Sequence, residues 1–298
     1  MMIAYLNGEW VAPEEARVSV FDRGFMFGDA VYEVMAVYGG DIFLLEAHLA
    51  RLIRSLAEIR LPSPYDHKTW VSLLREAIDR SGERDGYLYL QVTRGVEASR
   101  SHVYSGKSKP TVLITMTSDT KQENKEPLHV ATKPDYRWLR TDIKVTSLIA
   151  NSMIKNEAVA EGFDEAILVR DGFVTEATSA NFFMVAGNVI QTPPLSNLLL
   201  HGVTRNHIIA IARTAGITIE ETAISESQLL TAEEAWISST GNEIRPIATI
   251  NGSPVGNGLP GKICHKLDKL FHPYLVREVF FLKYLVRMKK NIMVVQVI

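Results

Sequence analysis

Residues 165–176 read EAILVRDGFVTE, and this stretch is the most informative about how the chain folds. Two runs rich in apolar and β-branched residues flank Asp171-Gly172, a pair that favours the two-residue turn of a β-hairpin. The pattern is repeated directly afterwards, because residues 181–185 and 189–192 flank Gly187-Asn188. Successive hairpins predict a mixed α/β (α+β) chain and argue against a doubly wound sheet of parallel strands.

The first third of the chain alternates between strand and helix patterns. Residues 30–38 are apolar on both faces, which predicts a covered strand, and the carboxylate of Glu33 within it needs a partner. The next stretch predicts a helix with Arg51 opposite its apolar face, and that face consists of Leu45, Leu49, Leu52, Ile53 and Leu56. Further elements are expected as a helix at 66–81 and strands at 87–94 and 111–117.

A polar and charged run, SDTKQENKEP at residues 118–127, is the best linker candidate. A division into two domains follows from it. We expect a smaller N-terminal α/β domain at 1–118, an interdomain linker at 119–127, a larger C-terminal domain at 128–275 and an atypical C-terminal extension at 276–298.

The composition excludes several classes of protein. The net charge of −2 over 298 residues gives no reason to expect a nucleic-acid or membrane-surface partner. No signal peptide or transmembrane stretch is recognised, so a cytoplasmic location is expected. The histidines show no metal-ligand spacing, and no metal site is predicted. Cys264 is the only cysteine, and a packed position in a helix at 262–271 is expected for it.

Two segments could bind an anion. Residues 200–206, LHGVTRN, place a glycine before a predicted helix at 204–215 that Thr204 would cap, and backbone N–H groups at a helix start bind phosphate well. Residues 236–243, WISSTGNE, end a predicted strand in hydroxyls and a glycine. Each segment alone is more often an ordinary cap or turn.

Two further segments could contact an organic ligand. Residues 174–181, VTEATSAN, combine one carboxylate with small side chains that let a flat molecule approach the backbone, although a tight bend would use the same residues. In residues 99–102, SRSH, Arg100 and His102 lie two apart in an extended segment and so point the same way. They could converge on one carboxylate, and the alternative is a solvated basic loop.

Taken together, these segments resemble the class IV pyridoxal-phosphate (PLP) dependent aminotransferases. The resemblance runs from about Tyr5 to about Phe271 and rests on many short matches in the same order. The matching motifs are VFDRGFMFGDAVYE at 20–33, EAHLARL at 46–52, DIK at 142–144, NEA at 156–158, DEAIL at 164–168, TE at 175–176, NFF at 181–183, TPP at 192–194, GVTR at 202–205 and EIRP at 243–246.

The resemblance implies a fold and a cofactor. The fold would be that of a two-domain fold type IV PLP enzyme, with a smaller N-terminal α/β sandwich and a larger C-terminal pseudo-barrel domain. Lys144 would form the Schiff base with pyridoxal 5′-phosphate and then act as the catalytic base at the substrate α-carbon. Glu176 would face the pyridine nitrogen and keep the ring protonated, and Arg51 would pair with the phosphate.

The resemblance also implies further cofactor-binding residues. Leu200 would pack on the ring. The phosphate site would be completed by Val203, Thr204, Ser239 and Thr240, and two small residues after Glu176 would lie against the cofactor, Thr178 and Ser179.

Arg100 and His102, with Tyr32, look like the substrate-carboxylate site of bacterial D-amino-acid aminotransferases. The expected reaction moves an amino group from a D-amino acid, such as D-alanine, to a 2-oxo acid, such as 2-oxoglutarate. In that group the carboxylate site is completed across a dimer interface, so a homodimer is implied.

Three alternatives remain open at this point. They are an L-branched-chain aminotransferase, a lyase acting on aminodeoxychorismate and a PLP-binding protein without catalysis. The sequence departs from the family pattern at Ala30 and Ala177, where glycine is frequent, and at Gly241-Asn242, where relatives have a more hydroxyl-rich turn.

Overall fold

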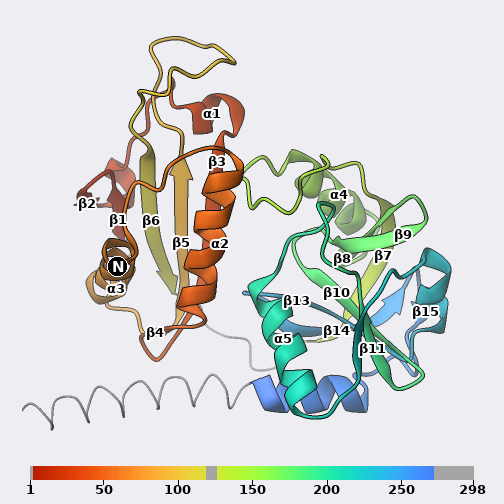
Figure 1. Ribbon diagram of the computed structural model, residues 1–298. Helices are drawn as coiled ribbons and strands as arrows, with labels where there is room; N and C mark the ends of the chain where they lie inside the picture. Colours follow the sequence, from red (N-terminus) through yellow and green to blue (C-terminus); the bar gives the residue numbers. More distant parts are fainter. Residues whose placement is uncertain (1–2, 119–125, 272–298) are drawn as a thin grey trace, which may run out of the picture.

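The computed structural model describes residues 3–118 and 126–271, and it contains two β-sheets that lie side by side (Figure 1). The expected extension at 276–298 lies outside the described residues, as does most of the expected linker. The polar run at 118–127 falls between the last strand of the first sheet and the first strand of the second. The domain bounds themselves stay a prediction.

The N-terminal half is a six-stranded sheet covered by two helices. The strand order is β2-β1-β6-β5-β3-β4, and every pairing in it is antiparallel. Its strands are β1 (Ile3–Leu6), β2 (Glu9–Val11), β3 (Ala30–Tyr38), β4 (Asp41–Ile42), β5 (Gly86–Thr93) and β6 (Thr111–Ser118). Its helices are η1 (Pro13–Glu15), α1 (Arg23–Phe27), α2 (Leu45–Glu58) and α3 (His67–Ser81).

Helices α2 and α3 form where the periodicity predicts them. In α2, Leu49, Leu52 and Leu56 are buried against the sheet. Helix α3 begins after Asp66, whose carboxylate accepts a hydrogen bond from the Thr69 N–H at 2.8 Å, and it ends at Gly82 in a left-handed conformation. These contacts fix α2 along β3, which brings its second face toward the C-terminal half.

The C-terminal half is a nine-stranded mixed sheet. Its order is β12-β11-β10-β13-β14-β7-β8-β9, with β15 paired to β14. Its strands are β7 (Leu128–Pro134), β8 (Glu165–Arg170), β9 (Phe173–Ala177), β10 (Asn181–Ala186), β11 (Val189–Thr192), β12 (Ile219–Glu221), β13 (Glu234–Ser239), β14 (Glu243–Ile250) and β15 (Ser253–Pro254). Its helices are α4 (Ile149–Ala160), α5 (Val203–Thr214) and η2 (Glu226–Thr231), and residues 262–271 are also helical.

Both predicted hairpins are confirmed. Strands β8 and β9 pair antiparallel across Asp171 and Gly172, and both turn residues have positive φ angles, 52° and 79°. Strands β10 and β11 pair in the same way across Gly187 and Asn188. The mixed α/β class is therefore confirmed, and a doubly wound sheet is excluded.

Lone Cys264 lies in the helix at 262–271, as expected. Its side chain is buried in the core formed with α5 and β13, and burial raises the pKa of its thiol to about 12. Within the residues that the structure describes, no helix combines the length and apolar character needed to cross a membrane.

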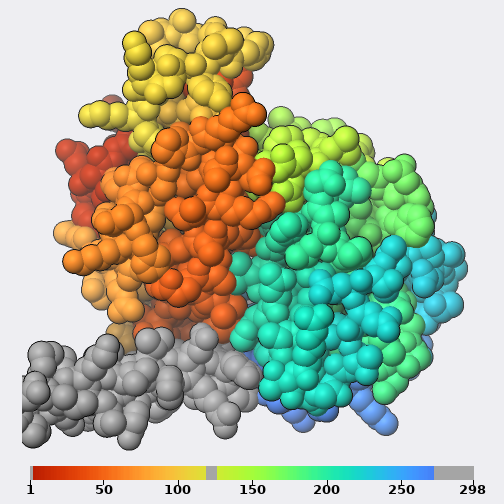
Figure 2. Space-filling view, viewed as in Figure 1, coloured from red at the N-terminus to blue at the C-terminus, as the bar shows by residue number. Residues whose placement is uncertain are grey.

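The two halves contact each other along β3. The Tyr32 N–H donates to the Lys144 carbonyl at 3.0 Å, and the Thr146 N–H donates to the Ala30 carbonyl at 3.1 Å. Residues 144–146 therefore run beside β3 as an additional short pairing. Figure 2 shows the N-terminal half, in red to yellow, closely packed against the green and blue C-terminal half.

Candidate active site

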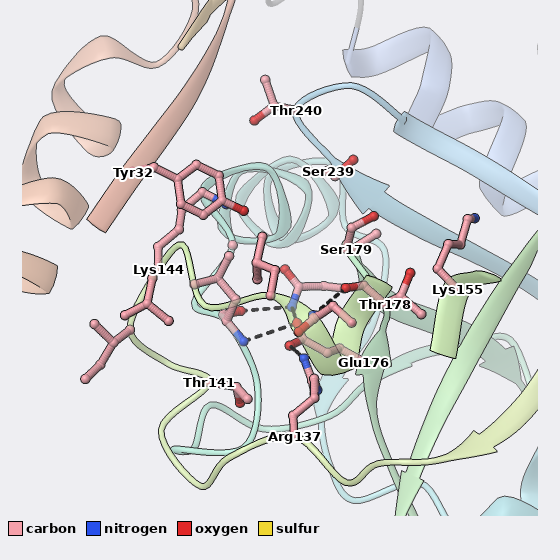
Figure 3. Close-up of a pocket in the computed structure, with 18 of the residues that line it drawn as sticks. Tyr32, Arg137, Thr141, Lys144, Lys155, Glu176, Thr178, Ser179, Ser239 and Thr240 are labelled. Atoms are coloured by element: carbon pink, nitrogen blue, oxygen red, sulfur yellow. Dashed lines mark hydrogen bonds and ion pairs between the residues drawn. The ribbon is translucent and has the colours of Figure 1, made fainter. Parts of the chain in front are cut away.

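A cavity lies between the two sheets, and most of the predicted site residues line it (Figure 3). The N-terminal half contributes side chains from β3 and α2, and the C-terminal half contributes the ends of several strands and the start of α5. The predicted residues brought together here are Tyr32, Arg51, Lys144, Glu176, Thr178, Ser179, Leu200, Val203, Thr204, Ser239 and Thr240.

Lys144 occupies the segment that runs beside β3. Its Nζ atom lies 4.2 Å from the centre of the Tyr32 ring. Burial lowers the pKa of Lys144 to about 8, and the nearby positive charge of Arg51 acts in the same direction. A lysine with such a pKa exists partly as the neutral amine near pH 7, which is the form that attacks carbonyl carbon and accepts protons.

Glu176 lies near the end of β9 with both carboxylate oxygens bound. Oε1 accepts a hydrogen bond from Arg137 at 2.6 Å, and Oε2 accepts from the Asn181 side chain and the Leu200 N–H, both at 3.1 Å. Burial raises the pKa of Glu176, and Arg137 acts against that rise. The residue is thus a buried carboxylate at the floor of the cavity.

Arg137 is a site residue that the sequence reasoning missed. It lines the cavity, and its guanidinium joins Glu176 to Asp135, whose Oδ2 lies 2.8 Å from Nη2. The sequence did carry a signal, since a carboxylate predicted to be buried needs a cation. No periodicity or turn pattern marks which arginine supplies it.

Arg51 projects from α2 into the cavity, and it is only 8% exposed. The face of the helix that the periodicity assigns to solvent therefore faces the C-terminal half. Nε and Nη2 of Arg51 donate to the two oxygens of Glu33 at 2.7 and 2.8 Å, and His48 lies 2.8 Å from the same carboxylate. These two residues are the partners that Glu33 requires, and their hydrogen bonds hold the pKa of Glu33 at about 2 despite its burial.

The start of α5 provides free backbone donors at the cavity wall. The expectation that Thr204 caps this helix is wrong: the N-cap is Gly202, which has no capping side chain, and Val203 and Thr204 form the first turn. A Cβ atom at Gly202 would lie 1.9 Å from Oδ1 of Asn181, so close packing requires glycine there. The first N–H groups of α5 stay available for an anion.

The end of β13 faces this helix start across the cavity. Ser239 accepts hydrogen bonds from Asn242, and the Thr240 hydroxyl donates to the Val34 carbonyl at 3.2 Å. Neighbouring Ser238 is 1% exposed and lines the cavity, and its hydroxyl has no hydrogen-bond partner among the described residues. A buried hydroxyl without a partner beside free helix-start donors fits a bound phosphate group.

Arg100 and His102 are not among the residues that line this cavity. They lie on the exposed loop between β5 and β6, at the end of the N-terminal sheet beside α1 (Figure 1). The structure therefore does not bring them to Lys144 of the same chain. Their role stays a prediction that involves a second copy of the protein.

Residues 30–250 match the family described as amino-transferase class IV. A D-alanine aminotransferase from Bacillus licheniformis is 41% identical over 279 residues, which are 93% of this chain and 98% of that protein. A branched-chain aminotransferase from the archaeon Thermoproteus uzoniensis, solved with norvaline, has a TM-score of 0.83 at 29% identity and covers 91% of this chain and 93% of its own. The T.th. branched-chain amino acid aminotransferase, solved with pyridoxamine 5′-phosphate, has a TM-score of 0.84 at 26% identity, with 90% and 92% covered.

Proposed function

This chain belongs to the class IV aminotransferases, and we propose that it transfers the amino group of a D-amino acid such as D-alanine to a 2-oxo acid such as 2-oxoglutarate. The cofactor of this family, and of this chain, is pyridoxal 5′-phosphate. The observation that carries the proposal is the meeting of Lys144, Glu176 and Arg51 in one cavity. The D-alanine aminotransferase that is 41% identical over nearly the whole chain supports the D-amino-acid substrate.

The residues of the cavity suit the two ends of this cofactor. Arg51, the first N–H groups of α5 and the Ser238 hydroxyl would hold the phosphate, with Ser239 and Thr240 beside them. Glu176 would face the ring nitrogen from the opposite end. When bound, the cofactor supplies an electron sink for the charge left as the α-proton departs.

Lys144 is the residue that we propose moves the proton. Its Nζ atom would take the proton from the substrate α-carbon and return it on the cofactor side of the same cavity. A pKa of about 8 suits both directions, because the amine then accepts and releases a proton near neutral pH. Tyr32, whose ring lies beside Nζ, limits where that amine can point.

The substrate carboxylate would be bound by Tyr32, Arg100 and His102. Since the loop that carries Arg100 and His102 lies away from its own cavity, this role requires the loop of a partner subunit, and we propose a homodimer. A cytoplasmic location belongs to the same proposal, and the single buried cysteine is consistent with a reducing compartment.

The test is a substrate comparison with purified holoenzyme. D-alanine with 2-oxoglutarate should yield pyruvate, and the visible absorption of the bound cofactor should bleach when D-alanine alone is added. An L-branched-chain aminotransferase is the second candidate, because both solved structures named above are of branched-chain aminotransferases. Bleaching by L-leucine and not by D-alanine would replace the first candidate with the second.

A further inference from the structure

The loop between β5 and β6 is held from below by Arg23, a residue with no role in the proposed function. This arginine is 4% exposed, whereas residues 99–106 of the loop are exposed. Nη1 of Arg23 donates to the Ser101 carbonyl at 2.6 Å, and Nη2 donates to the His102 carbonyl at 3.3 Å. One guanidinium therefore binds two successive carbonyls in the segment that contains Arg100 and His102.

Arg23 is itself held rigidly. Its Nε donates to Asp29 at 2.9 Å, and Arg94 donates to the same carboxylate. The Arg23 N–H donates to the Gly95 carbonyl, and the preceding Asp22 caps α1 while also accepting from two threonine hydroxyls of β5 and β6. The short helix is thereby attached to the ends of two strands, and the Arg23 fork has a fixed origin.

The aromatic ring of Phe27 adds a second contact beneath the same loop. The guanidinium of Arg23 lies 4.7 Å from the ring centre, and that of Arg100 lies 4.9 Å from it. The centre of the His102 ring lies 5.4 Å from the centre of the same Phe27 ring. The two side chains assigned to the substrate carboxylate thus share one aromatic platform with Arg23.

We propose that Arg23 is a positioning residue for substrate binding, which fixes the main chain at residues 101–102 so that Arg100 and His102 present their side chains together to a carboxylate. The proposal rests on the proposed function, because it takes Arg100 and His102 as the carboxylate site. Ordering a loop before binding raises affinity, since the entropy cost of fixing it is met on folding. Arg23 acts through the loop and does not contact the substrate.

Arg94 shows by contrast what a purely structural arginine does in the same cluster. It donates to the carbonyls of Ile59 and Arg60 after α2, and within the described residues its guanidinium makes no hydrogen bond to residues 100–102. Asp29 receives both arginines, so its negative charge does not distinguish them. The carbonyl contacts of Arg23 are what connect this cluster to the substrate loop.

The experiment compares Arg23→Gln, Arg23→Lys and Arg100→Ala holoenzymes for KM, kcat and melting temperature with D-alanine as the donor. Loss of the fork should raise KM for D-alanine by about tenfold, with kcat changed much less, because the effect is on binding. Arg23→Lys keeps a cation beside Asp29 but cannot bind two carbonyls at once, so it should still raise KM while it keeps the melting temperature of the wild type. The lysine variant decides the matter if Arg23→Gln does not fold.

The Arg23→Gln change should add nothing to KM in the Arg100→Ala background, because Arg23 acts through Arg100. Arg80→Gln is the matched control: Arg80 also pairs with a carboxylate, Glu76, and lies 5.3 Å from an aromatic ring, but far from the loop in sequence, and KM should stay at the wild-type value. A raised KM in Arg100→Ala with an unchanged KM in Arg23→Lys overturns the positioning role alone. An unchanged KM in Arg100→Ala overturns the carboxylate site and the positioning role together.

Discussion

The guanidinium of Arg137 donates a hydrogen bond of 2.6 Å to Glu176, and both side chains are buried at the floor of the cavity. Burial alone favours the neutral acid, and the positive charge of Arg137 favours the carboxylate. Asp135 in turn binds Arg137 and holds it in place, and the pKa of Asp135 is lowered to about 2 in that contact. A chain of alternating charges therefore extends from the core of the C-terminal half to the cavity.

Replacing Arg137 by Met should lower kcat by about a hundredfold, because loss of a buried ionic partner costs about 3 kcal/mol. Without the guanidinium the pKa of Glu176 rises further, so the acid limb of the kcat–pH profile should move to higher pH. Arg170→Met is the matched control, since Arg170 binds Asp135 but makes no hydrogen bond to Glu176 within the described part of the chain. Equal losses in the two variants would show that Arg137 acts only on stability.

Replacing Lys144 by Ala should remove transamination and the visible absorption band of the bound cofactor. The reason is that Nζ of Lys144 is the amine in the cavity beside Tyr32. Lys133→Ala serves as the control, because Lys133 pairs with Glu161 outside the cavity and should leave both readouts intact. An unchanged spectrum in Lys144→Ala contradicts the assignment.

The rate at which apoenzyme takes up pyridoxal 5′-phosphate should depend on the ionisation of Lys144. Burial lowers its pKa to about 8, so the fraction of neutral amine, and with it the rate, should rise as pH increases through about 8 and then level off. Stopped-flow absorbance between about pH 6 and about pH 9.5 measures it. A rate that keeps rising toward the ordinary lysine pKa of 10.5 would contradict the lowered value.

Replacing Glu33 by Gln should weaken cofactor binding and change the acid stability. The ordinary pKa of 4.5 falls to about 2 in the fold, so the ionised Glu33 stabilises the protein above pH 4.5, and this contribution of about 3 kcal/mol is lost as pH falls toward 2. Urea unfolding of the apoprotein at several pH values should show that loss in the wild type and a shallower dependence in Glu33→Gln.

The same variant tests how Arg51 is positioned. Its guanidinium loses both bonds to Glu33, so the Kd for the cofactor should rise by about tenfold. Glu46→Gln is a control on the same helix, because Glu46 is exposed and pairs with His67. Identical affinities of wild type and Glu33→Gln would show that Arg51 needs no such support.

Replacing Gly202 by Ala should destabilise the protein by about 1–3 kcal/mol and weaken cofactor binding, because the new methyl group meets Oδ1 of Asn181 at 1.9 Å. Asn181 also binds Glu176, so its displacement reaches the floor of the cavity. Gly241→Ala is the control, since its nearest neighbour would be the Tyr87 hydroxyl at 3.8 Å. Similar losses of stability in both variants would argue against the clash.

Local patterns predicted the elements well because their causes are local. Asp171-Gly172 specifies its turn through backbone angles that few other pairs adopt, and the helix at 66–81 carries its own cap and terminator. Most of the cofactor residues were predicted only through the family resemblance. The periodicity of α2 placed Arg51 on a solvated face, since it records which residues are apolar and not what covers the polar side.

Other features depend on contacts that no short window contains. Arg137 and Glu176 are separated by 39 residues, and only the sheet brings β9 beside the segment after β7. Thr204 was expected to cap α5 because threonine is a common cap, but the packing of Gly202 against Asn181 starts the helix earlier. Arg23 supports a loop residue 78 positions away, which no reading of neighbouring positions reveals.

The walls of the cavity come from both halves of the molecule, with Tyr32 and Arg51 on one side and Glu176 and Thr204 on the other. A molecule held between them contributes its binding free energy to the cohesion of the whole chain. Vitamin B6 supply would then govern the lifetime of the enzyme in the cell as well as its turnover, because chains without cofactor open more often and are cleared sooner by proteases.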